Sequence, residues 1–146
     1  MKNRIVVITM AFVLFFLTAL VALLFFAPAI ANWYVSFRTM PPILTDVILC
    51  AFYICAVPAG AALLLVFRLL QNIHRGQLFF PMNTRLMTAI SWCCMMVALV
   101  TAISAVWYLP FCFITVAMLF IFLIVRVVRA CWRSAIELKE ENSLTI

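Results

Sequence analysis

Four long apolar runs, at residues 5–26, 47–67, 86–108 and 112–128, contain no acidic side chain. A helix needs about 20 mainly apolar residues to cross a bilayer, because the hydrocarbon core is about 30 Å thick. Each run is therefore long enough to span a membrane. The whole chain has 146 residues, which leaves little room for a soluble domain. The sequence predicts an all-α integral membrane protein, a single antiparallel bundle of four transmembrane helices over residues 1–146.

The composition points to the same class of protein. The chain is 70% hydrophobic and 10% charged, with a mean hydropathy of +1.30. Soluble domains are about 45–50% apolar and about 25% charged. These values exclude a soluble globular protein, a disordered tail and a coiled-coil rod.

The first run has a second interpretation, as the apolar core of a signal peptide. Residues 27–31 read Ala-Pro-Ala-Ile-Ala, which offers small side chains to a signal peptidase. The apolar core of a signal peptide is about 7–15 residues long. Because the run at 5–26 is longer, we favour a retained helix over a cleaved leader.

The basic residues predict the orientation of the chain. Ten Lys and Arg outnumber four Asp and Glu, which gives a net charge of +6. All of these basic residues except Arg38 lie before the first run, between the second and third, or near the end of the fourth and beyond it. Positive residues flanking spans mark the cytoplasmic side, so both termini are expected to be cytoplasmic. Membrane topology explains the basic charge, and direct binding of nucleic acid is not expected.

Small residues predict where the helices pack against one another. In the second run, Ala56 and Gly60 form a small-xxx-small pair on either side of Pro58. In the third run, small residues recur at helical spacings of three and four: Ser91, Cys94, Ala98, Ala102 and Ala105. This pattern predicts that the third helix packs in the middle of the bundle.

Side chains suited to catalysis or metal binding are scarce. The only histidine is His74, and the six cysteines lie mostly in apolar runs without a CxxC motif. Asp46, the only acid outside the C-terminal tail, is expected to cap the second helix. We therefore expect no enzyme activity, cofactor or metal site. Whether the adjacent Cys93 and Cys94 have a redox role stays open.

The segment 68–83 joins the second and third runs on the cytoplasmic side. The second helix is expected to continue past the membrane as a short stub that ends at Gly76. Phe79 and Phe80 are expected to lie in the membrane interface, and Asn83 is expected to cap the third helix.

The tail 129–146 is expected to continue the fourth helix into the cytosol. Its apolar stripe comprises Val128, Cys131, Ala135 and Leu138, widened by Trp132 and Ile136. Such a helix can lie on the bilayer, pack on the chain's own cytoplasmic segment or dock a partner. The glutamates disfavour lying flat on anionic lipid, and the sequence leaves open whether the helix packs on the stub of the second helix or docks a partner. The candidate partner-binding residues are Arg75, Arg129, Arg133, Glu137, Leu138, Glu140, Glu141, Asn142, Leu144 and Ile146.

Two patterns carry a resemblance to a known family. The first pattern is Asn72-Ile73-x-x-Gly76-x-x-Phe79-x-x-x-Asn83-x-x-x-x-Met87-x-x-Ile90. The second is the ending at 135–146, Ala-Ile-Glu-Leu-Lys-Glu-Glu-Asn-Ser-Leu-Thr-Ile. With these patterns the chain resembles, over nearly its whole length, a bacterial membrane protein family catalogued as domain-of-unknown-function family 2975. Members of that family typically end close to ELKEENDLTI, and Ser143 stands here in place of the Asp.

The resemblance implies a bacterial cytoplasmic (inner) membrane protein without an established activity. Genes of the family often lie beside a small helix-turn-helix regulator of the Cro type. We therefore predict a membrane-embedded regulatory or sensor protein that binds or sequesters such a cytosolic DNA-binding protein through 68–83 and 126–146. The alternatives are a small transporter or an accessory subunit of one, and an immunity or envelope-stress protein. The sequence also leaves homo-oligomer formation open.

Overall fold

The computed structural model describes residues 2–144, and within them it contains helices and no strand. The four helices are α1 (Lys2–Phe37), α2 (Ile43–His74), α3 (Pro81–Ser104) and α4 (Phe111–Leu144). All four are long and apolar enough to cross a membrane. The prediction of an all-α chain with four helices of this kind is confirmed.

The helix ends differ from those expected of the apolar runs. Helices α1, α2 and α4 contain 36, 32 and 34 residues, so each is about 50 Å long and exceeds the hydrocarbon core. Helix α3 ends at Ser104 because Trp107 and Tyr108 form the turn to α4. Helix α2 begins at Ile43, so Asp46 lies inside its first turn. The prediction that Asp46 caps α2 is wrong, although its charge still favours the positive end of the helix dipole.

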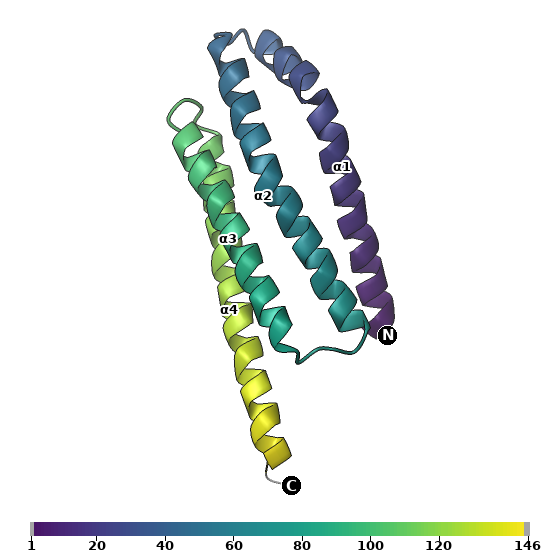
Figure 1. Cartoon of the computed structure of the whole chain (residues 1–146). Coiled ribbons are helices and arrows are strands. Elements are labelled where there is room, and N and C mark those ends of the chain that lie inside the picture. Colours follow the sequence, from purple (N-terminus) through teal and green to yellow (C-terminus); the bar gives the residue numbers. More distant parts are fainter. Residues whose placement is uncertain (1, 145–146) are drawn as a thin grey trace.

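Successive helices run up and down through the molecule, as Figure 1 shows. The start of α1 and the end of α4 lie at the same end of the molecule as the α2–α3 loop, which we call the terminal end. The α1–α2 and α3–α4 turns lie at the other end, the turn end.

Each helix packs only on its neighbours along the chain. Helix α1 packs on α2, α2 on α3 and α3 on α4, and no other pair of helices meets within residues 2–144. The helices thus form an open row, an arrangement that the sequence left open. An open row is stable in a membrane because lipid covers an apolar helix face as well as another helix does.

Helix α3 is the most buried of the four. Its buried residues lie along one side of the helix: Asn83, Met87, Ile90, Ser91, Cys94, Val97, Ala98, Thr101 and Ser104. Near the turn end, the Thr115 hydroxyl of α4 donates a hydrogen bond to the Thr101 hydroxyl at 2.9 Å. The position of α3 between α2 and α4 explains why a polar side chain such as Thr101 is buried there with its hydrogen bonds made.

The predicted packing residues lie at different depths. Ala56, Ser91, Cys94 and Ala98 are buried, and Gly60 and Ala105 are half-buried. Ala102 is exposed, so its assignment to the packed face is wrong. After Ala98 the buried side continues three residues later at Thr101, and Ala102 is rotated about 100° away from that position.

The surface that α1 presents to α2 follows a heptad pattern. Most of its buried and half-buried residues alternate at spacings of four and three: Val6, Met10, Val13, Leu17, Leu20, Leu24, Ala27 and Ala31. Because α1 contacts no helix except α2 within the described residues, this is the surface that meets α2. A Cβ atom at Gly60 of α2 would lie 3.6 Å from Leu20 Cδ2. The heptad spacing keeps one side of α1 against its only neighbour over many turns.

Ala98 and Ala102 provide a direct test of the packed face of α3. Ala98 is 2% exposed, so Ala98→Leu should overpack the core and lower the free energy of unfolding by about 1–3 kcal/mol. The control Ala102→Leu should change it by less than about 0.5 kcal/mol. Thermal unfolding in one detergent, followed by circular dichroism, measures both. Equal losses for the two variants would contradict the structure.

Candidate functional site

The α2–α3 loop at the terminal end begins with a Schellman motif. Gly76 has a φ of +79°, in the left-handed region that a glycine adopts without strain. Its N–H donates to the Ile73 carbonyl at 3.1 Å, and the Gln77 N–H donates to the Asn72 carbonyl at 3.0 Å. These two bonds satisfy the last carbonyls of α2. The prediction that Gly76 ends the second helix is confirmed.

The buried side chain of Asn83 forms hydrogen bonds with the backbone of the α2–α3 loop. Its side chain is fully buried, and its Nδ2 donates to the carbonyls of Gln77 at 2.9 Å and Leu78 at 3.0 Å. Its Oδ1 accepts a hydrogen bond from Asn72 Nδ2 at 3.1 Å. The prediction that Asn83 caps α3 is wrong, because α3 begins two residues earlier and its N-cap, Phe80, makes no side-chain cap bond.

The part of α4 beyond its apolar run packs on this same loop. Trp132 Nε1 donates to the Leu78 carbonyl at 2.9 Å, so that oxygen accepts bonds from both Trp132 and Asn83. Lys139 Nζ lies 4.5 Å from the centre of the Phe79 ring, a cation–π contact. Ile136 lines a cavity of about 230 Å³ with Phe79 and Lys139. The tail thus packs on the loop after the stub of α2 and not on the stub itself, since α2 and α4 do not meet within residues 2–144.

The predicted stripe of the tail is packed in part. Ala135 and the widening residues Trp132 and Ile136 are half-buried, whereas Val128, Cys131 and Leu138 are exposed. Trp132 and Ile136 face the loop. The indole N–H of Trp132 favours this side of the stripe, because it finds an acceptor in the loop.

The candidate partner-binding residues lie mostly on the outside of α4. Arg133 and Glu137 form an ion pair at 3.5 Å. Of the candidates in the tail, the exposed ones are Arg133, Glu137, Leu138, Glu140, Glu141, Asn142 and Leu144. Arg129 is half-buried, Arg75 is exposed at the end of α2, and Ile146 lies outside the described residues.

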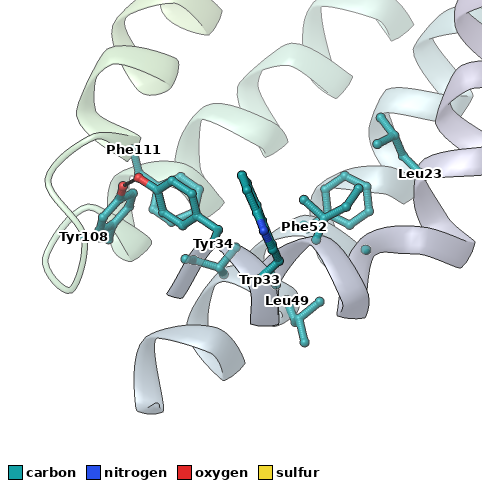
Figure 2. Close-up of a pocket in the computed structure, with 11 residues that line it drawn as sticks. Leu23, Trp33, Tyr34, Leu49, Phe52, Tyr108 and Phe111 are labelled. Atoms are coloured by element: carbon teal, nitrogen blue, oxygen red, sulfur yellow. Dashed lines mark hydrogen bonds between the residues drawn. The ribbon is translucent and has the colours of Figure 1, made fainter. Parts of the chain in front are cut away.

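A second feature, an apolar pocket at the turn end, was not expected from the sequence. Figure 2 shows the pocket between α1 and α2, with a volume of about 390 Å³. Its lining is almost entirely apolar: Leu23, Ala27, Ile30, Ala31, Trp33, Tyr34, Ile48, Leu49, Phe52, Tyr108 and Phe111. The sequence does not predict this pocket, since no local pattern shows that Trp33 and Tyr34 lie near Tyr108.

At the edge of the pocket the hydroxyl groups of Tyr34 and Tyr108 share a hydrogen bond, drawn as a dashed line in Figure 2. This bond connects the end of α1 to the α3–α4 turn. The hydrogen bond with Tyr34 raises the pKa of Tyr108 above its usual value of about 10, although Arg38 acts in the opposite direction.

No group of three or more His, Cys, Asp or Glu side chains within residues 2–144 is placed to hold a metal ion. All six cysteines are free thiols, including the neighbours Cys93 and Cys94.

Substituting Asn83 tests whether this side chain holds the loop. Asn83→Ala removes three hydrogen bonds, so the Gln77 carbonyl loses its Asn83 donor and the Leu78 carbonyl keeps only Trp132. We expect the free energy of unfolding to fall by about 2–4 kcal/mol, because each hydrogen bond contributes about 0.5–1.5 kcal/mol. The exposed Asn142 serves as control, and Asn142→Ala should have almost no effect. Thermal unfolding in detergent measures both, and an unchanged midpoint for Asn83→Ala would contradict this role.

Comparison with known proteins identifies the family of this chain. The family model described as "Protein of unknown function (DUF2975)" matches residues 26–146. No curated protein and no solved structure matches the chain. The matched region contains the Schellman glycine, the buried Asn83 and the packed tail. The chain belongs to the DUF2975 family.

Proposed function

We propose that this chain is a membrane-embedded regulator that binds a cytosolic protein through the far end of α4. In this proposal the terminal end lies in the cytoplasm of a bacterium, and the helices cross the inner membrane in alternating directions. The distribution of charge supports the orientation. Arg68, Arg75 and Arg85 lie on α2, α3 and the loop between them, and Arg38 is the only basic residue near the turn end.

The exposed side of the α4 extension carries the proposal. Glu137, Glu141 and Leu144 recur at spacings of four and three, on the side opposite the packed residues Trp132 and Ile136. Leu144 is 86% exposed. This side is mainly acidic and ends in one exposed leucine, so it suits a partner groove that pairs basic side chains with an apolar contact.

The contacts with the α2–α3 loop keep this helix in place. The Trp132 hydrogen bond and the Lys139–Phe79 contact hold α4 on its inner side. A helix that is already ordered loses less conformational entropy on binding than a flexible tail does. The loop contact and partner docking are therefore compatible, because they use opposite sides of α4.

The charge of the exposed side favours a basic partner. Glu137, Glu140 and Glu141 are all the acids of the chain except Asp46. A helix-turn-helix protein, the partner class that the family resemblance implies, uses basic side chains to bind DNA phosphates. The acidic end of α4 would compete with DNA for such a surface, and sequestration of the regulator at the membrane follows.

Crosslinking in intact cells, followed by purification through an N-terminal tag, tests this proposal. Glu137→Ala with Leu144→Ala removes one acid and one leucine from the exposed side. Asp46→Ala with Leu109→Ala removes the same residue types at the turn end and serves as control. We expect a helix-turn-helix protein with the wild type and the control, and roughly tenfold less with the first variant, since central interface residues contribute more than about 1 kcal/mol each. Equal recovery with both variants would refute docking on this side.

The apolar pocket favours a second candidate function, a small transporter of apolar molecules or an accessory subunit of one. Leu23→Trp should fill the pocket, because Leu23 lines it. Leu14→Trp adds the same side chain at a lipid-exposed position of α1 that does not line this pocket. If the pocket carries substrate, proteoliposomes with this chain alone should release N-phenyl-1-naphthylamine faster than empty liposomes, and only Leu23→Trp should abolish the difference. Release at the rate of empty liposomes would exclude this function for that class of solute.

A further inference from the structure

Three arginines gather on one side of α4, where its long apolar run ends. Arg126, Arg129 and Arg133 are spaced by three and four residues and line, with Ala130, a cavity of about 200 Å³. Residues at these spacings share one side of a helix. All three basic side chains therefore border one small volume, and their combined charge favours an anion there.

The arginines are poorly compensated by the protein itself. The guanidinium of Arg126 lies 5.7 Å from the centre of the Phe122 ring, a contact that brings no countercharge. Arg133 pairs with Glu137 at 3.5 Å, but both side chains are mostly exposed, so the pair is weak. Arg129 Nε is buried and has no hydrogen-bond partner among the described residues. A buried N–H without an acceptor is costly, and a ligand with acceptor oxygens in this cavity would satisfy it.

The position of the cavity along α4 indicates the source of the anion. The apolar stretch of α4 runs to residue 128 and is interrupted only by Arg126. The cavity thus lies where the helix leaves the hydrocarbon, at the level of the lipid headgroups. Long arginine side chains near a helix end extend toward phosphates at that level.

We propose that Arg126, Arg129 and Arg133 form a binding site for the phosphate group of an anionic phospholipid. Guanidinium groups match the geometry of phosphate oxygens and donate paired hydrogen bonds to them. A phospholipid without a cationic headgroup fits best, because the cavity is lined by arginines and offers no acid of its own. The bound lipid fixes the depth of α4 in the membrane, and the site does not depend on the identity of any cytosolic partner.

Retention of lipid by the purified protein tests this site. The full chain is reconstituted in nanodiscs of equal phosphatidylglycerol and phosphatidylcholine, extracted in mild detergent and measured by native mass spectrometry. The site variant is Arg126→Gln with Arg129→Gln and Arg133→Gln. The control, Arg68→Gln with Arg75→Gln and Arg85→Gln, removes the same charge from α2, α3 and their loop.

We expect the wild type and the control to retain phosphatidylglycerol over phosphatidylcholine, and the site variant to lose roughly tenfold or more of that preference, since several basic contacts are removed. An equal loss in the two variants would show a general effect of charge and overturn the proposal. A wild type without preference would also overturn it. If the triple variant fails to insert, Arg129→Gln alone is compared with Arg68→Gln by the same criterion.

Competition with soluble phosphate shows whether the bound phosphate group belongs to a phospholipid or to a soluble compound. Inorganic phosphate at millimolar concentration is added during extraction. Unchanged retention of phosphatidylglycerol supports a lipid ligand, because the acyl chains add affinity that free phosphate lacks. Complete displacement would assign the arginines to a soluble phosphate compound and overturn the lipid assignment.

Discussion

The carbonyl oxygen of Leu78 is the point at which three helices of this protein are connected. It accepts hydrogen bonds from Asn83 of α3 and from Trp132 of α4, and Asn83 in turn accepts one from Asn72 of α2. Apolar contacts distinguish helix neighbours poorly in a membrane, because lipid is as apolar as leucine. Polar contacts of fixed geometry therefore decide which surfaces of α2, α3 and α4 face one another at the terminal end.

At the turn end, a similar polar contact determines the position of α1. The helices α1 and α4 do not meet within residues 2–144, and the Tyr34–Tyr108 hydrogen bond is what connects α1 to the α3–α4 turn. The apolar pocket lies beside this bond. A molecule in the pocket would thus contact α1, α2 and the turn that begins α4. If the pocket senses an apolar signal, α4 is the element that reaches from there to the exposed side of the tail.

The sequence predicts features that depend on local order along the chain. Four apolar runs predict four helices, and Gly76 predicts the end of α2, because both follow from residues close in sequence. Prediction from the sequence fails where the outcome depends on a contact between two distant segments. Which side of the tail packs depends on the hydrogen bond from Trp132 to Leu78. The inward orientation of the Asn83 side chain depends on the same carbonyl. The prediction for Ala102 is wrong for a different reason. Two successive spacings of four lead from Cys94 to Ala102, and because an α-helix repeats every 3.6 residues, the second step leaves the packed side.

The structure also divides a set of residues that the sequence groups together. Arg129, Arg133 and Glu137 follow one another at spacing four and read as a single charged side for a partner. In the fold, Arg129 is half-buried beside Arg126 at the end of the apolar stretch, whereas Glu137 is exposed farther along α4. In our two proposals, the basic residues at the headgroup level bind lipid phosphate and the acidic residues beyond them bind a basic protein. Lipid bound at the arginines would keep the acidic end at a fixed distance from the membrane, where a regulator bound to it could not reach DNA.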